Sequence, residues 1–133
     1  MSQSYLLDTN AVLWMLEDSP KLGRHVRADL EDFNRTFFVS DIVFLEMAIK
    51  MRTGKLRRFS IHEIEDMLAR NGMQTVTFDA WAAQVFFDLP ATSWGDPFDR
   101  AHMALAEAKR LTLVTSDKNI LQSGAVRCLD AGL

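Results

Sequence analysis

The sequence of 133 residues has few of the features that mark a specialised structural class. Cysteine occurs once, at Cys128, which excludes an internal disulfide and a thiolate-rich metal site. There are three prolines and six glycines, and no Pro/Gly/Ser-rich linker, repeat or low-complexity tract interrupts the chain. We therefore expect a single domain that spans residues 1–133.

Long apolar runs are missing as well. The opening segment MSQSYLLDTN has no basic start and reaches an acid after a short apolar run, which is typical neither of a secretory signal nor of a membrane span. Hydrophobic residues make up 48% of the chain and charged residues 25%, as in globular proteins that bury a core. These features predict a cytoplasmic protein with no membrane partner.

An overall excess of positive charge is also absent. The formal net charge of −3 argues against a protein whose whole surface attracts phosphate backbones. A local basic patch can still bind a polyanion, and one short stretch is rich in cations. An alternative is a solvated helix end whose basic residues are favoured by the helix dipole. The residues of this stretch are Lys50, Arg52, Lys55, Arg57 and Arg58.

Short apolar or β-branched runs alternate with segments of helical periodicity. Helix caps and stops predict helices that begin after Asp8 and Ser60, further helices over 20–33, 40–53, 79–88 and 96–110, and a short helical turn from Asp117. Strands are predicted at 5–7, 36–39, 74–77, 111–114 and 125–129. This alternation predicts an α/β fold with a mainly parallel sheet.

Several acids lie at predicted strand-to-helix junctions, where ligands gather in open parallel sheets. Asp8 follows the first predicted strand and Asp117 follows the fourth. Asp99 lies one turn inside the helix that Asp96 is expected to cap, and it should point toward Asp8. Each of these residues also has a purely structural interpretation, as a helix cap or as the acid of a capping box.

Glu46 lies on an apolar helix face, where its neighbours at three and four positions include Ile42, Val43 and Ile49. A carboxylate held on such a face loses water and needs a cationic partner, a metal or a raised pKa. Lys50, one turn further on, is the structural alternative to a metal.

Carboxylates that converge at one edge would repel one another, and a hard divalent cation relieves that repulsion. Mg²⁺ or Mn²⁺ suits such a site better than Zn²⁺, which prefers nitrogen and sulfur ligands. We expect surface or packing positions for the scattered His25, His62 and His102, although His102 shares a helix face with Asp99. We expect core or interface positions for Trp14, Trp81 and Trp94.

Four segments together resemble the PIN-domain nucleases, and more narrowly the VapC-type toxins of bacterial and archaeal toxin–antitoxin pairs. These segments are Leu6-Leu7-Asp8-Thr9-Asn10, Glu46 within 40–56, Asp96-Pro97-Phe98-Asp99-Arg100 and Thr115-Ser116-Asp117. The resemblance covers nearly the whole chain. It implies a PIN-like three-layer fold in which helices flank a mainly parallel five-stranded sheet. At position 10 the sequence departs from the pattern, because close relatives frequently have histidine there.

The resemblance also implies a metal-dependent endoribonuclease that hydrolyses RNA phosphodiester bonds with Mg²⁺ or Mn²⁺. Asp8, Glu46, Asp99 and Asp117 would be the catalytic and metal-binding acids, and Thr9, Asp96 and Ser116 would be secondary contributors. A bound cation can activate water and neutralise charge that grows on the phosphate. Our hypothesis for the RNA-backbone groove is the basic stretch from Lys50 to Arg58 together with Arg100. The expected partners are a second copy of the chain and an antitoxin that lies in a groove near the first helices.

Two other functions fit part of the pattern. A PIN-like protein could act as a binding module without catalysis, its carboxylates holding a structural metal. A phosphoacceptor or phosphatase-like protein would also place an acid after the first strand, but the haloacid-dehalogenase type needs a second acid two positions after Asp8. Asn10 occupies that position.

Overall fold

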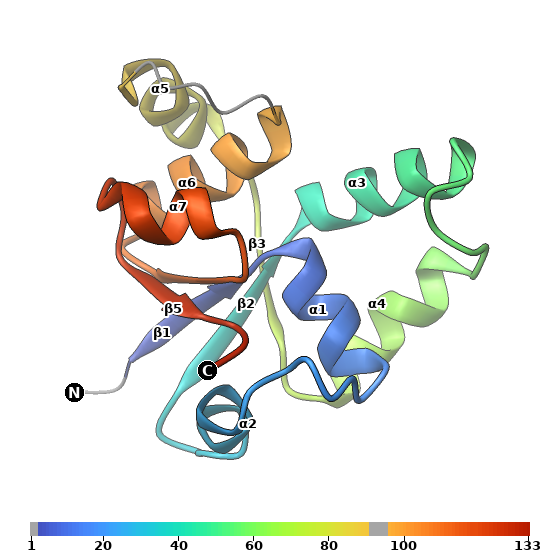
Figure 1. The fold of residues 1–133 in the computed structure, drawn as a ribbon. Coiled ribbons are helices and arrows are strands. Elements are labelled where there is room, and N and C mark those ends of the chain that lie inside the picture. The colour runs from blue at the N-terminus through green and yellow to red at the C-terminus, as the bar shows by residue number, and fades with distance from the viewer. Residues whose placement is uncertain (1–2, 91–95) are drawn as a thin grey trace.

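The structure is a computed structural model that describes residues 3–90 and 96–133. Within these ranges the chain forms five strands and seven helices (Figure 1). The strands are β1 (Ser4–Leu7), β2 (Thr36–Ser40), β3 (Gln74–Val76), β4 (Thr112–Thr115) and β5 (Cys128–Asp130). The helices are α1 (Thr9–Leu16), α2 (Arg24–Leu30), α3 (Asp41–Arg52), α4 (Ile61–Arg70), α5 (Ala80–Asp88), α6 (Pro97–Lys109) and α7 (Lys118–Ser123).

The strands form one sheet in the order β3-β2-β1-β4-β5, and all of its paired strands are parallel. In the central strand β1, Tyr5 pairs with Phe37 of β2 on one side and with Thr112 of β4 on the other. The chain moves outward from β1 through β2 to β3 and then crosses back to β4. The strand order therefore reverses between β1 and β4, which makes the carboxyl ends of these two strands the topological switch point of the sheet. The predicted α/β fold with a parallel five-stranded sheet is confirmed.

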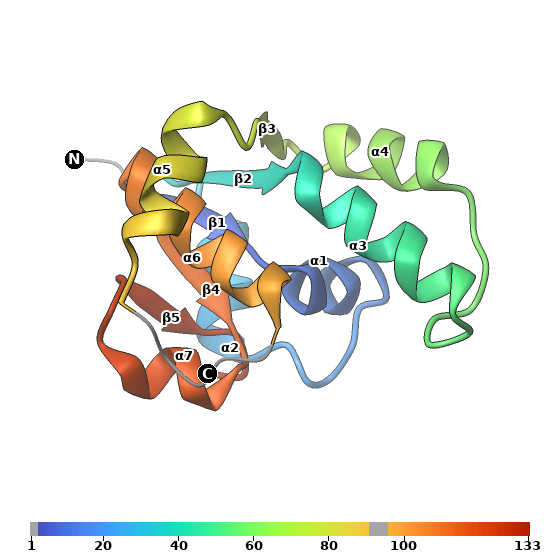
Figure 2. The same ribbon diagram turned by 90° about the horizontal axis from the view of Figure 1, so that it is seen from above.

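Alternating side chains along the strands build a core on each face of the sheet. Tyr5 and Leu7 belong to a cluster with buried side chains of α1 to α4, among them Val12 and Met47. Leu6 points to the opposite face and packs in a second cluster with buried residues of α5, α6 and α7. Figure 2 shows the sheet between α1, α3 and α4 on one side and α5 to α7 on the other. This arrangement confirms the three-layer prediction.

Local signals set several helix ends where the sequence predicted them. The Ser40 hydroxyl accepts a hydrogen bond from the Ile42 amide at 3.0 Å and caps α3. The Asp96 carboxylate accepts from the Phe98 amide at 2.8 Å and caps α6. Gly54 follows α3 with a φ of +77°, a conformation that glycine adopts without steric cost.

The predicted helix over 20–33 is wrong at both ends, because α2 covers Arg24–Leu30. A turn precedes it, closed by a hydrogen bond of 3.1 Å from the Leu22 amide to the Ser19 carbonyl. Gly23 then begins the helix, and its amide donates to the carbonyl of Ala131 at 2.9 Å. Packing against the last strand region thus fixes where α2 starts.

The last strand also differs from its prediction at 125–129, since β5 covers Cys128–Asp130. Its register is set by the neighbouring strand, because Leu113 of β4 pairs with Cys128. In the described residues, 3–90 and 96–133, no helix combines the length and the apolar character that a membrane crossing needs.

Candidate metal and catalytic site

The predicted acids are brought to the carboxyl-terminal edge of the sheet, around the switch point. Asp8 and Asp117 follow the adjacent strands β1 and β4. Glu46 lies on α3, which follows β2, and Asp99 lies in the first turn of α6. The negative charges of Asp96, Asp117 and Asp8 all act on Asp99, so these carboxylates lie near one another, and we call this region, with Glu46, the acidic pocket.

Asp8 is buried, with 7% of its surface exposed. One of its carboxylate oxygens accepts a hydrogen bond from the Ala11 amide at 2.8 Å and caps α1. Burial raises the pKa of Asp8 above its usual value, against the opposing effects of the Thr115 hydroxyl and the Ala11 amide. Asp8 therefore does act as a helix cap, and it does so in a desolvated position near Glu46.

Asp99 carries the clearest electrostatic sign of a cation site. Burial, and then the charges of Asp96, Asp117 and Asp8, raise its pKa to about 7. Burial and these neighbouring charges therefore make the ionised form of Asp99 unfavourable, against an opposing effect of His102. A divalent cation would relieve this repulsion.

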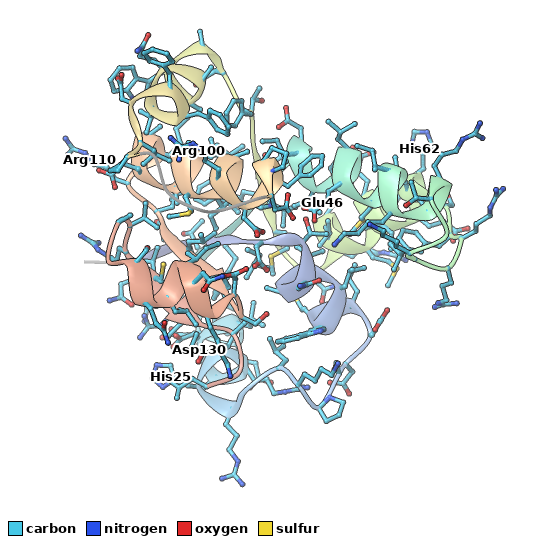
Figure 3. The ribbon with its side chains drawn as sticks, turned by 45° about the horizontal axis from the view of Figure 1, so that its top comes forward. His25, Glu46, His62, Arg100, Arg110 and Asp130 are labelled. Carbon is cyan, nitrogen blue, oxygen red and sulfur yellow. The ribbon has the colours of Figure 1, made fainter. Side chains whose placement is uncertain are left out.

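Glu46 is buried at 6% exposure, and both of its carboxylate oxygens have partners. Oε1 accepts from the Thr9 hydroxyl at 2.6 Å and lies 3.3 Å from Nε2 of His102. Oε2 lies 3.0 Å from Nζ of Lys50, so the pairing that the sequence suggested is present. Burial alone would raise the pKa of Glu46, but the hydrogen bonds from His102, Thr9 and Lys50 outweigh it and lower the pKa to about 2. Figure 3 shows Glu46 where α3 approaches α6 and α1.

The other predicted site residues lie close to these acids. Asp117 caps α7 by accepting a hydrogen bond from the Ile120 amide at 3.1 Å. Its own amide donates to the Thr115 hydroxyl, also at 3.1 Å, and Ser116 lies half-buried between the two. Asp96 is exposed and acts on the pocket through its charge near Asp99.

His102 is the site residue that sequence reasoning left out. We expected a surface or packing position, but only 1% of His102 is exposed and its ring contacts Glu46 and Thr9. The available signal was its position three residues after Asp99 on the same helix. His25 and His62 are exposed, as expected.

Two of the three tryptophans lie in the described residues. Trp14 is partly buried and packs against the core, as predicted. Trp81 is 58% exposed, so it is not a core residue. Trp94 lies outside the described residues.

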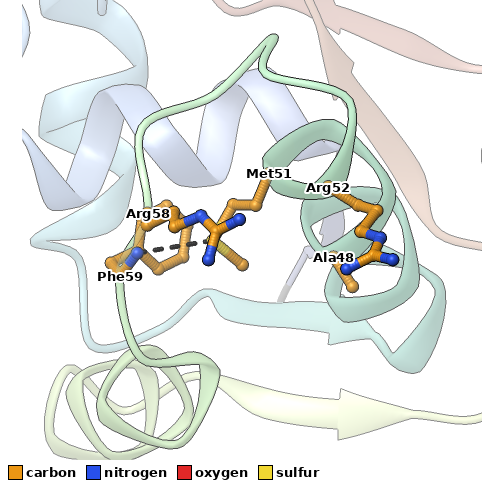
Figure 4. Close-up of a pocket in the computed structure, with 5 residues that line it drawn as sticks. All are labelled: Ala48, Met51, Arg52, Arg58 and Phe59. Atoms are coloured by element: carbon orange, nitrogen blue, oxygen red, sulfur yellow. Dashed lines mark hydrogen bonds between the residues drawn. The ribbon is translucent and has the colours of Figure 1, made fainter.

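The basic stretch does not form one face. Lys50 and Lys55 line a cavity of about 330 Å³ that also borders Glu46 and Phe98. Arg52 and Arg58 line a different pocket, of about 280 Å³, together with Ala48, Met51 and Phe59 (Figure 4). Arg57 lines a third, of about 270 Å³, between α1 and α4.

Arg100, which we expected in the RNA-backbone groove, contacts the end of α5. Its guanidinium donates to the carbonyl oxygens of Phe86, Leu89 and Pro90 at the end of α5. It also lies over the ring of Phe86, 5.2 Å from the ring centre. Figure 3 shows Arg100 on the part of α6 near α5, apart from Glu46. These contacts assign Arg100 to helix packing.

The residues fit a divalent cation in chemistry and charge. The donors are carboxylate oxygens, and burial together with the negative charges of Asp96, Asp117 and Asp8 disfavours an ionised Asp99 that has no cation beside it. Within 3–90 and 96–133, however, no three His, Cys, Asp or Glu side chains are placed close enough to enclose an ion. Binding would therefore require the carboxylates to reorient, including Glu46, whose Oε2 is engaged by Lys50.

The fold and the site together define a parallel α/β protein with an acidic pocket at the switch point of its sheet. The family model of the PIN domain matches residues 5–125. The chain belongs to the PIN domain family. This confirms the resemblance drawn from the four sequence segments.

Solved structures show the same fold at low sequence identity. The VapBC2 complex from Rickettsia felis, bound to a DNA fragment from its promoter, has a chain that matches with a TM-score of 0.67 and 17% identity, covering 96% of this chain and 98% of that one. DNA-bound VapBC from Salmonella typhimurium matches with a TM-score of 0.68 and 17% identity, covering 98% of each chain. A toxin–antitoxin complex from Klebsiella pneumoniae matches with a TM-score of 0.64 and 18% identity, covering 96% and 97%. None of the curated protein sequences matches this chain.

Proposed function

We propose that this protein is a divalent-metal-dependent endoribonuclease that acts in the cytoplasm as the toxin of a toxin–antitoxin pair, with residues 1–133 as a single nuclease domain. The observation that carries the proposal is the placement of Asp8 and Asp117 after the adjacent strands β1 and β4, with Asp99 in the first turn of α6 near both. Burial and three neighbouring carboxylates raise the pKa of Asp99 to about 7, at the switch point of a PIN-family sheet. Such an arrangement favours a bound cation.

Asp8, Glu46, Asp99 and Asp117 would hold Mg²⁺ or Mn²⁺, and the cation would supply water activation and charge neutralisation at the phosphate. The residues of the chain hold some of these carboxylates in place before a cation binds. Capping hydrogen bonds hold one carboxylate oxygen of Asp8 and one of Asp117, so the reorientation that cation binding requires would fall mainly on Glu46 and Asp99. Burial of Asp8 and Glu46 strengthens every electrostatic interaction in the pocket.

The cavity between α3 and the start of α6 is the part of the surface best suited to carry RNA toward these acids. Lys55 and Lys50 supply positive charge, and Phe98 supplies an aromatic side chain beside Glu46. Single-stranded nucleic acid is commonly bound by such a combination of cations and aromatic rings. We propose this cavity in place of the continuous groove from Lys50 to Arg58.

Two partners belong to the proposal. An antitoxin segment would lie in the groove between α1 and α4, whose walls include Leu13, Leu16, Ile64 and Met67. The similar solved structure from Klebsiella pneumoniae is a toxin–antitoxin complex, which supports an antitoxin as a partner of this chain. A second copy of the chain would cover apolar side chains that are exposed on α3 and α5. These are Leu45 (55% exposed), Ile49 (43%), Trp81 (58%) and Phe87 (80%).

Cleavage of a mixed cellular RNA pool tests the nuclease. Purified protein, free of any antitoxin, is incubated with Mg²⁺ or Mn²⁺ and separately with a chelator. The variants Asp8→Asn and Asp99→Asn are compared with Asp79→Asn, which makes the same change at the exposed cap of α5. Asparagine still caps a helix, so Asp8→Asn removes the charge and retains the fold.

We expect cation-dependent cleavage by the wild type and by Asp79→Asn, and a loss of at least about a hundredfold in the two pocket variants. Equal cleavage by all four proteins would overturn the proposed site. If the wild type cuts nothing, the noncatalytic binding module becomes the better function. One observation favours that alternative: both oxygens of Glu46 are already engaged by protein donors.

A further inference from the structure

We propose that His102 is a positioning residue that, together with Thr9, fixes Oε1 of Glu46 and leaves Oε2 as the oxygen that turns to a cation. The inference rests on the proposed function, because it concerns how the pocket receives its metal. Three elements meet at this carboxylate: the first turn of α1, the middle of α3 and α6.

The three side chains that meet at Oε1 of Glu46 are all buried. His102 is 1% exposed, Thr9 is 2% exposed and Glu46 is 6% exposed. Nε2 of His102 lies 3.3 Å from Oε1 of Glu46 and 3.4 Å from the Thr9 hydroxyl. The hydroxyl in turn lies 2.6 Å from Oε1. Two side chains from different helices therefore converge on one carboxylate oxygen.

The hydrogens in this cluster can be assigned by elimination. At 2.6 Å the Thr9 hydroxyl donates its hydrogen to Oε1, since a carboxylate oxygen accepts. His102 can then engage Oε1 only by donating, so its proton lies on Nε2. Nδ1 is buried and has no hydrogen-bond partner among the described residues, so no contact there requires a hydrogen on it. The contact with Oε1 thus selects the tautomer of His102 that carries its proton on Nε2.

The two oxygens of Glu46 differ in how their partners are held. The donors to Oε1 are almost completely buried, and a side chain locked in this way keeps its geometry. The partner of Oε2 is Lys50, whose side chain is 32% exposed and flexible. A cation entering the pocket can displace Lys50 from Oε2 while Oε1 stays fixed.

The same contact relates two of the proposed metal ligands. His102 lies three residues after Asp99, on the same face of α6. Its hydrogen bond to Glu46 therefore joins α6, the helix that carries Asp99, to α3. Partners of this kind, which bind a ligand residue and not the metal, commonly change metal affinity 10- to 100-fold when removed.

Mn²⁺ binding to the full chain, followed by electron paramagnetic resonance of the free ion, tests the inference without requiring catalysis. His102→Leu removes both ring nitrogens, and His102→Gln returns an amide donor near the position of Nε2. His62→Leu, at an exposed histidine of α4, is the matched control. We expect His102→Leu to weaken Mn²⁺ binding about tenfold, His102→Gln to recover most of the loss and His62→Leu to change nothing.

Thr9→Val supplies a second test, because it removes the other donor to Oε1 and keeps the side-chain volume. Both variants act on the same oxygen, so the effect of Thr9→Val with His102→Leu should be smaller than the sum of the single effects. Additive losses would overturn the shared role. If a variant fails to fold, nitrogen-15 NMR spectra of the His102 ring in the wild type supply a third readout. A proton on Nδ1 in place of Nε2 would also overturn the proposal.

The outcomes separate this inference from the proposed function. If the wild type binds Mn²⁺ and cuts RNA while His102→Leu binds Mn²⁺ equally well, only the role of His102 is lost. If the wild type binds no Mn²⁺, the metal-dependent nuclease and the role of His102 both fail.

Discussion

Lys50 and Glu46 pair across one turn of α3, with Nζ 3.0 Å from Oε2. Glu46 is buried, whereas a third of the Lys50 side chain is exposed. Breaking such a pair would leave the buried carboxylate without its counter-ion, which is costly. Lys50 is therefore the counter-ion of Glu46 in the acidic pocket, and Lys55 is the cation of the neighbouring cavity that the proposed RNA contact would use.

Removing the charge of Asp99 should stabilise the metal-free protein at neutral pH. The folded-state pKa of about 7 lies above the ordinary value of 3.8, so the folded state binds more protons between these values and its stability falls as pH rises from about 4 to about 7. Asp99→Asn should raise the free energy of unfolding by about 1–2 kcal/mol at pH 8, a value reduced for solvent screening. The gain should vanish near pH 4. Urea unfolding with chelator present measures both, and an equal gain at the two pH values would contradict the pKa.

Lys55→Met should weaken the binding of a single-stranded RNA oligonucleotide and reduce its dependence on salt, because each phosphate contact releases counter-ions. Arg57→Met should change the binding less, since Arg57 lies in the groove between α1 and α4. Arg70→Met, an exposed change at the end of α4, is the control. Fluorescence anisotropy between 50 and 200 mM salt, a range in which such contacts differ measurably, provides the comparison. If Arg57→Met weakened RNA binding more than Lys55→Met, the result would support the RNA groove along Lys50 to Arg58 that the sequence suggested.

Arg100→Met should destabilise the protein without affecting RNA affinity. The guanidinium joins α6 to the free carbonyls at the end of α5, and the loss of charge-assisted hydrogen bonds of this kind costs about 1–3 kcal/mol. Urea unfolding measures the first effect, and RNA anisotropy measures the second. If Arg100→Met lowered RNA affinity and left the stability unchanged, Arg100 would be an RNA-binding residue.

Leu45→Lys should dissociate the proposed homodimer. The side chain is 55% exposed on α3, and a cation buried without a partner in an interface is strongly unfavourable. Ala69→Lys, the same charge change at an exposed position of α4, should leave the dimer intact. Size-exclusion chromatography with light scattering measures the oligomeric state of the wild type and of both variants. A wild-type monomer at high concentration would rule out the dimer itself.

Much of the fold could be predicted because local rules dominate there. Apolar strand runs, capping residues such as Ser40 and Asp96, and the glycine stop at Gly54 depend on neighbours within a few positions in the chain. The bounds of α2 and β5 could not be predicted in this way. They depend on a hydrogen bond from Gly23 to Ala131 and on the pairing of β5 with Leu113 of β4, which join segments far apart in the sequence.

The site divides in the same way. Residue types and spacing alone marked Asp8, Glu46, Asp99 and Asp117 and the chemistry of a hard cation. Three-dimensional packing was needed to turn His102 inward to Glu46, to commit Arg100 to α5 and to distribute the basic stretch among separate pockets. The physical reason is that side-chain direction and burial depend on which helices pack together, and no pattern along a single helix contains that information.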